Sequence, residues 1–147
     1  MPSPSADPDA FPTLYSGIQD FYARQMRCLD NGAAEEWSLT FTEDARMALP
    51  GLPQPLRGRD ALASAVRRAA RDLAERGEVH RHWHGMLSVD RLPDPAAVRA
   101  SCYALVIATP RNSEPRLHRS CVCEDTLVRA DGRWLVRERA VTRDDLP

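Results

Sequence analysis

The chain has 147 residues and a formal net charge of −1, and 43% of its residues are hydrophobic. That length and composition suit a single domain with a real core, and the balanced charge gives no sign of nucleic acid or of an anionic membrane as a partner. All 20 basic residues are arginine, and the lack of lysine excludes catalysis through a lysine Schiff base.

The first part of the chain is predicted to contain a tail, two helices and a proline-rich loop. Residues 1–12 are rich in Pro, Ser and Asp, which is typical of a disordered tail, and the folded domain is expected over 13–147. Apolar residues recur at helical spacing after Pro12-Thr13, and Asn31-Gly32 is a stop signal. The pattern then predicts a short helix over 33–41, a turn at 42–44, a strand at 46–49 and a loop over 50–55.

The second part changes from helix to strands. A third helix is predicted to begin at Asp60, a favourable N-cap, and to end at Gly77. The hydrophobic period then becomes two, which predicts long strands at 79–90, 98–109, 117–129 and 134–141. Asp131-Gly132 is a strong hairpin signal between the last two. Helices followed by an antiparallel meander indicate an α+β fold with helices on one face of the sheet.

Three of the four histidines stand at alternate positions in the first long strand. Successive side chains of a strand point to opposite faces, so one face is expected to carry His80, His82, His84, Met86 and Ser88. Imidazoles are costly to bury unpaired and change charge near neutral pH, which makes this strand the first candidate for chemistry. The opposite assignment stays open, in which the pocket is lined by Trp83, Leu87 and Val89.

Several segments of the chain resemble SnoaL-like proteins of the nuclear-transport-factor-2-like superfamily. The resemblance covers about residues 14–143, and it lies in the order and spacing of motifs that are each weak alone. These motifs are Ile18–Gly32 with Trp37 and Phe41–Ala45, then Pro55–Leu62, then Glu124–Arg129 with Asp131–Trp134 and Glu138-Arg139.

The resemblance implies a cone-shaped, curved antiparallel sheet whose N-terminal helices close an apolar pocket, and a homodimer formed through the outer sheet face. Relatives include polyketide cyclases, scytalone dehydratase, ketosteroid-isomerase-like enzymes and small subunits of ring-hydroxylating dioxygenases, so the fold alone does not settle the reaction. By resemblance we expect a cofactor-independent cyclase or dehydratase that acts by acid/base chemistry on an aromatic polyketide intermediate, in antibiotic-type secondary metabolism. The alternatives are a non-catalytic polyketide-binding or oxygenase accessory protein and a dioxygenase small subunit.

The resemblance also implies positions for the catalytic groups. Scytalone dehydratase-like members pair a pocket-facing Asp at the end of the first helix with a His on a long strand. The matching residues here are Asp30 with His82 as the first candidate base and His84 as the second. A second catalytic His of scytalone dehydratase has no counterpart, because Ala108 or Thr109 stands at that position.

Further candidates follow from side-chain chemistry. A tyrosine in an apolar cavity can stabilise developing negative charge, so Tyr22 and Tyr103 are candidates to hold a substrate oxygen. Polarizable methionines and aromatic rings suit a flat hydrophobic ligand. The other candidate substrate-binding residues are Met26, Trp37, Met47, Met86 and His118.

Metal and cofactor chemistry is not expected from the sequence. A His-x-His pair can chelate a metal, but no carboxylate stands near the three histidines, and Cys121-x-Cys123 does not have the spacing of zinc or redox motifs. The four cysteines are interpreted as small buried packing residues. With no signal peptide or membrane span visible, a hydrophobic small molecule is the expected partner and the cytoplasm the expected location.

Overall fold

The computed structural model describes residues 7–147, so half of the expected disordered tail lies outside the described residues. Within that range no helix is long and apolar enough to cross a membrane. The same residues form three helices and six strands, namely α1 (Phe11–Asp30), α2 (Ala34–Ser38), β1 (Phe41–Ala48), β2 (Leu56–Arg57), α3 (Gly58–Arg76), β3 (Glu78–Arg91), β4 (Ala97–Pro110), β5 (Arg116–Ala130) and β6 (Arg133–Arg143).

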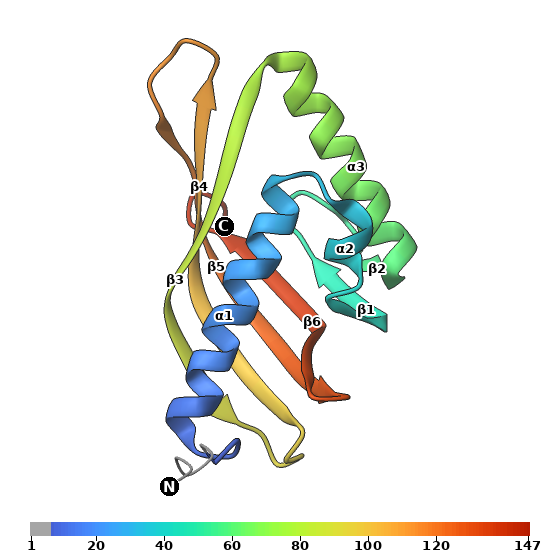
Figure 1. The fold of residues 1–147 in the computed structure, drawn as a ribbon. Helices are drawn as coiled ribbons and strands as arrows, with labels where there is room; N and C mark the ends of the chain where they lie inside the picture. The colour runs from blue at the N-terminus through green and yellow to red at the C-terminus, as the bar shows by residue number, and fades with distance from the viewer. Residues whose placement is uncertain (1–6) are drawn as a thin grey trace, which may run out of the picture.

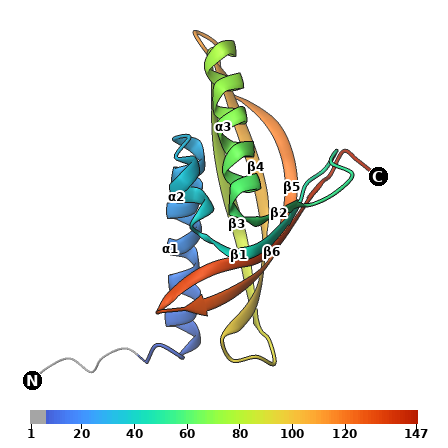
Figure 2. The ribbon, with the colours of Figure 1, turned by 90° about the vertical axis from the view of Figure 1, so that its right-hand side faces the viewer.

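The strands form one curved sheet in the order β2-β1-β6-β5-β4-β3. Neighbouring strands are antiparallel except β1 and β6, which run parallel. In Figure 1 α1 and α2 lie in front of the sheet and α3 lies beside it at the upper right, and Figure 2 shows the long strands curving toward α1. The predicted α+β cone, with helices on its concave side, is therefore confirmed.

The prediction was wrong in detail between the first helix and the first strand. The second helix ends at Ser38, and the expected turn at 42–44 is part of β1. The reason is tertiary packing, because Phe41 and Ala45 are fully buried and the amide of Val136 in β6 donates to the carbonyl of Thr40. Pairing with β6 overrides the local turn propensity of the polar residues, which lie where the β1–β6 register shifts.

Two helix ends also differ from the prediction, and a third agrees with it. Helix α1 begins at Phe11 and holds Pro12 in its first turn, where the missing proline amide costs nothing. Arg57, rather than Asp60, is the N-cap of α3, and Asp60 lies in the first turn. Gly77 ends α3 in the left-handed conformation at φ 63°, as predicted.

The core fills the space between the helices and the concave side of the sheet. Each fully buried apolar side chain contributes about 1.5–3 kcal/mol relative to its exposed state. Most of these residues come from α1, α2, α3 and the inner faces of the strands, and they include Leu14, Ile18, Tyr22, Trp37, Phe41, Leu62, Val66, Leu127 and Val136.

Candidate active site

A bulge in β3 changes which residues of the strand point into the cone: even-numbered residues before it and odd-numbered residues after it. His80, His82 and His84 share the inner face, as predicted, because their exposure alternates with that of the outward Arg81 and Trp83. The pairing with β4 then shifts between Gly85 and Ser88, and Met86 takes a positive φ of 53°. Beyond this point the odd-numbered residues face inward, and Val89 is buried.

The bulge changes where two of the predicted substrate-binding residues lie. Met86 and Ser88 do not continue the histidine row, and Met86 is 75% exposed, although it still lines the open cavity between α1 and β3. Tyr103, which pairs with Gly85, is 56% exposed on the outer face of β4. Neither Met86 nor Tyr103 therefore extends into the interior of the cone, and Tyr103 is not placed to hold a substrate oxygen there.

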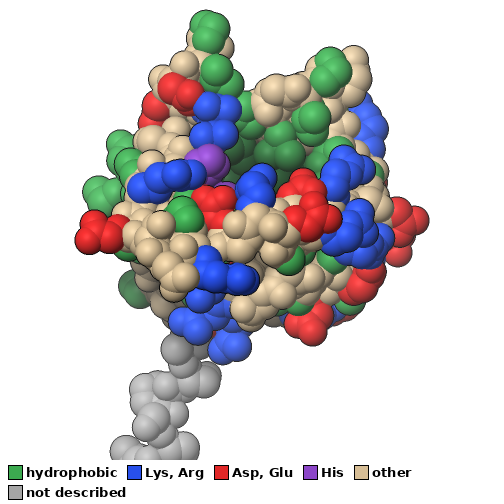
Figure 3. Space-filling view, turned by 90° about the horizontal axis from the view of Figure 1, so that it is seen from above, with side chains coloured by type: hydrophobic (Ala, Val, Ile, Leu, Met, Phe, Trp, Pro, Cys, Tyr) green, Lys and Arg blue, Asp and Glu red, His purple; other side chains and the backbone are tan. Residues whose placement is uncertain are grey.

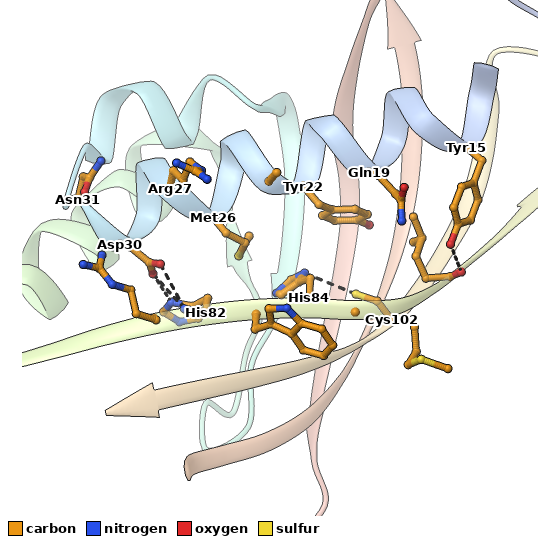
Figure 4. A pocket seen from close by; sticks show the side chains of 16 residues that line it. Tyr15, Gln19, Tyr22, Met26, Arg27, Asp30, Asn31, His82, His84 and Cys102 are labelled. Carbon is orange, nitrogen blue, oxygen red and sulfur yellow. Dashed lines mark hydrogen bonds and ion pairs between the residues drawn. The ribbon is translucent and has the colours of Figure 1, made fainter. Parts of the chain in front are cut away.

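A cavity of about 920 Å³ lies between α1 and β3. Figure 4 shows Tyr22, Met26 and Asp30 reaching from α1 toward His82 and His84 on the strand below. A second cavity, of about 370 Å³, lies inside the cone, and Met26, His82 and His84 line both spaces. The two inner imidazoles thus stand where the cavities adjoin.

Asp30 and His82 form a hydrogen-bonded pair at this point. Nδ1 of His82 lies 2.7 Å from Oδ1 of Asp30, and the backbone amide of His82 donates to both carboxylate oxygens, at 3.2 and 3.3 Å. The amide can bond to Asp30 because β3 is the edge strand of the sheet, so within the described part of the chain one side of β3 has no neighbouring strand to pair with. The same edge holds the other end of α1, where the Tyr15 hydroxyl donates to the carbonyl of Leu87.

The pair fixes the role of each ring nitrogen. An ionised carboxylate only accepts hydrogen bonds, so Nδ1 of His82 carries the proton and the lone pair of the neutral ring is on Nε2. The Asp30 side chain is 8% exposed and that of His82 is 28% exposed, which leaves the imidazole accessible from the cavity. A carboxylate at the C-terminus of a helix is disfavoured by the helix dipole, and its bonds to His82 offset that cost.

His84 has a different partner. Its Nδ1 lies 3.5 Å from the sulfur of Cys102 in β4, and its ring stands 5.5 Å from the ring of Tyr22. The pKa of Cys102 is lowered to about 5, chiefly by the neighbouring Cys123 thiol and further by His84. His84 is therefore bonded to a sulfur atom, whereas His82 is bonded to a carboxylate.

Tyr22 does not have the free hydroxyl that was expected of it. Its ring lines the larger cavity, but its hydroxyl donates its single proton to Oδ2 of Asp125 at 2.5 Å. Burial, followed by the charge of Asp125, raises its pKa far above the usual value. Asp125 is in turn held by Arg139 through two bonds of 2.9 Å. Tyr22 is thus part of a buried polar network and is not placed to donate to a substrate oxygen.

Trp37 and Met47 lie in the wall of the inner cavity. Trp37 is 2% exposed and stacks at a tilt on Phe41. Its indole Nε1 is buried and has no hydrogen-bond partner among residues 7–147. An unsatisfied buried donor is costly, so this N–H is available to an oxygen of a ligand in the cavity.

His118 lies outside both cavities, contrary to the expectation that it binds substrate. Its ring stands 5.0 Å from that of His80, on the next strand but one. His80 lies 3.7 Å from Glu78 and likewise lines neither cavity. The two histidines form a separate pair toward the end of the sheet.

This separate pair predicts a pH dependence of stability. Burial lowers the pKa of His80 below its usual 6.5, with Glu78 opposing the shift, and burial followed by Arg119 lowers that of His118. The folded state therefore disfavours the charged rings, and the free energy of unfolding falls as the pH drops below 6.5. Urea unfolding at about pH 7.5 and about pH 5.5 measures the fall. The double variant His80→Gln/His118→Gln should lose part of it, and an unchanged slope would contradict the assignment.

Sequence reasoning missed Cys102, which lines the larger cavity beside His84. It was interpreted as a packing residue, and no local motif marks it, because its partners come from other strands. The glycine at position 85 did carry a usable signal, since a glycine inside a strand pattern often marks a bulge. A Cβ at Gly85 would lie 2.1 Å from the Trp83 ring, so glycine leaves room for that ring.

The chain is similar to a known protein family and to several solved structures. A model of the SnoaL-like domain matches residues 13–140. Aln2 from a Streptomyces species is 34% identical, with a TM-score of 0.84 over 92% of this chain and 94% of that one. ActVI-ORFA from Streptomyces coelicolor is 29% identical, with a TM-score of 0.85 over 92% and 98%. A Catenulispora acidiphila protein solved in complex with S-DNPA is 37% identical, with a TM-score of 0.78 over 91% and 96%. Among curated proteins none matches.

Proposed function

The chain belongs to the SnoaL-like domain family, and from that premise we propose that it is a polyketide cyclase or dehydratase that removes a proton next to a carbonyl group. The observation that carries the proposal is the His82–Asp30 pair at the wall of a cavity large enough for a small molecule. The Catenulispora acidiphila relative, whose structure contains S-DNPA, supports a small-molecule ligand for this fold.

The chemistry proposed for His82 is general base catalysis. The Nε2 lone pair takes a proton from the carbon beside a substrate carbonyl, and Asp30 stabilises the imidazolium that results. The enolate then either attacks a second carbonyl to close a ring or expels a hydroxide. In both cases the imidazolium returns its proton to the oxygen that leaves or becomes a hydroxyl, so no organic cofactor is needed.

The walls of the inner cavity suit an apolar, flat substrate. They include Met26, Leu29, Met47 and Val106, and Figure 3 shows a hollow with hydrophobic side chains inside and charged ones around its rim. The Trp37 N–H supplies a donor for a substrate oxygen within these walls. An aromatic polyketide intermediate, with a hydrophobic ring system and several ketone oxygens, fits this combination.

An Asp30→Asn variant tests the proposal. The amide can direct its NH₂ group at the ring, which would place the ring proton on Nε2 and remove the lone pair from the cavity. We expect kcat/KM to fall by about 10²-fold or more, while the free energy of unfolding changes by less than about 1 kcal/mol, because a charge is removed from a helix C-terminus. Steady-state kinetics and urea unfolding measure the two quantities.

The matched control is Asp20→Asn, which alters an exposed carboxylate on the same helix. It should leave kcat/KM unchanged and lower the free energy of unfolding by no more than about 1 kcal/mol. Equal activity of Asp30→Asn and the wild type would refute the base assignment. Binding of a bicyclic aryl ketone without any turnover of polyketide substrates by the wild type would instead favour a binding protein.

We also propose that the protein forms a homodimer through the outer face of β3 and β4. This face exposes Trp83, Tyr103 and Met86, which are 53%, 56% and 75% exposed. Aromatic and methionine side chains that gather on one face are typical of interfaces. The register supports such a cluster, since Gly85, between Trp83 and Met86 in β3, pairs with Tyr103 in β4.

A Trp83→Asp/Tyr103→Glu double variant tests the homodimer. Its charges would have to be desolvated in the interface, so we expect it to sediment as a monomer at concentrations where the wild type sediments as a dimer. Phe11→Asp, which alters an exposed apolar residue on α1, should leave the dimer intact. A monomeric wild type, or a double variant that still dimerises, would refute this interface.

A further inference from the structure

We propose that His84, Cys102 and Cys123 form a binding site for zinc in the wall of the cavity. Their ligand atoms all lie within 4.8 Å of one another, and both cysteines are buried. The site is separate from the His82–Asp30 pair, although it lies next to it along β3. It departs from the sequence expectation of no metal, which did not count Cys102 and Cys123 as ligands for the histidine strand.

The sheet supplies one ligand from each of three adjacent strands. Cys102 of β4 stands directly opposite Cys123 of β5, and His84 of β3 pairs with Ala104, two residues further along β4. Nδ1 of His84 and the sulfur of Cys102 are 3.5 Å apart. A nitrogen at 2.0–2.1 Å and a sulfur at 2.3 Å from a tetrahedral zinc ion lie about 3.6 Å apart. The observed spacing therefore needs little adjustment to accept the ion.

The ligand chemistry also selects zinc. Two thiolates and an imidazole are a known zinc ligand set that leaves a fourth position open, and soft sulfur ligands favour zinc over magnesium or calcium. The two sulfur ligands come from residues that face each other directly across β4 and β5. Because a thiol binds zinc as its thiolate, binding of Zn²⁺ releases protons from the cysteine ligands.

Groups around the ligands balance the charge. Asp125 accepts a hydrogen bond from the Cys123 thiol at 3.4 Å and is itself held by Arg139, which is 4% exposed. Two thiolates, one aspartate, one arginine and a divalent ion sum to zero, so the loaded cluster buries no net charge. Outer partners of this kind orient ligands and strengthen metal binding.

The open fourth position would face the cavity, because His84 and Cys102 line it while Cys123 is fully buried behind them. There the ion could polarise a carbonyl oxygen of a ligand, in place of Tyr22, whose hydroxyl is bound to Asp125. This electrophilic role rests on the proposed function, whereas the binding of the ion does not.

The test is a titration of the reduced, chelator-treated full-length protein with Co²⁺ and then Zn²⁺. We expect one equivalent of Co²⁺ to give a thiolate-to-cobalt charge-transfer band and the visible bands of a tetrahedral site, and Zn²⁺ to displace it. Cys102→Ser and Cys123→Ser should each weaken binding by at least about 100-fold, the loss that a missing outer partner can already cause.

Three control variants should bind Co²⁺ as the wild type does, namely Cys28→Ser, Cys121→Ser and His82→Asn. The last separates this proposal from the proposed function, because it removes the base and leaves the three ligands in place. A reduced wild type without a thiolate charge-transfer band would overturn the site, whether or not the serine variants fold. So would a band of wild-type intensity in the double variant Cys102→Ser/Cys123→Ser.

Discussion

A His82→Asn variant is expected to lose about 10²–10⁴ in kcat/KM, the range that a positioned general base contributes. The asparagine amide can occupy the place of Nδ1 and keep the bond to Asp30, which in the native protein is 2.7 Å long. The asparagine side chain has no atom that matches Nε2, so the variant lacks the lone pair that faces the cavity in the native protein. The loss should therefore appear mainly in kcat rather than KM, because the cavity wall is otherwise unchanged. Steady-state kinetics on a polyketide substrate measures this split.

His118→Asn provides the matched control for this prediction. It makes the same chemical change at a histidine that lines neither cavity, so its kcat/KM should equal that of the wild type. Circular dichroism and urea unfolding establish that both variants keep the fold. Equal losses in the two variants would show that the effect does not come from the His82–Asp30 pair.

An Asp125→Ala variant is expected to lower the free energy of unfolding by about 3–5 kcal/mol, the cost of leaving one partner of a buried ion pair alone. Asp125 is 2% exposed and receives two bonds from Arg139 and one from Tyr22. Without it the guanidinium of Arg139 keeps, among residues 7–147, only its hydrogen bond to Gln25. Urea unfolding at neutral pH measures the change.

Two further variants separate the buried pair from a general effect of charge. Asp20→Ala removes an exposed partner of Arg24 on α1 and should cost no more than about 1 kcal/mol. The double variant Asp125→Ala/Arg139→Met should recover part of the lost stability, since no buried charge then stays unpaired. A cost of Asp125→Ala as small as that of Asp20→Ala would contradict this view of the network.

The long strands and the two long helices could be predicted because their hydrophobic periods are strong and uninterrupted. The prediction became wrong where tertiary pairing decided the outcome, as at Phe41, which a sheet contact with Val136 draws into β1. In β3 the period of two placed the three inner histidines correctly. The same period wrongly placed Met86 on the face of the histidines, because the bulge after Gly85 turns the residues that follow it to the opposite face.

The site could be predicted only in part, and for an identifiable reason. The pairing of Asp30 with His82 was expected by resemblance to a family, and the edge position of β3 explains how the helix reaches the strand. Hydrogen bonding between distant residues has no local sequence signal. The hydroxyl of Tyr22 is taken by Asp125, more than a hundred residues away, and the grouping of His84 with Cys102 and Cys123 depends on the register of three strands.

The most direct measurement is the exchange of protons for deuterium at the carbon beside the ketone of a bound bicyclic aryl ketone. In heavy water, nuclear magnetic resonance should show that the wild type catalyses this exchange and that His82→Asn does not, because the Nε2 atom of His82 removes the proton. Exchange at the same rate in both proteins, or none above the uncatalysed rate in the wild type, would contradict a proton-abstracting role for His82.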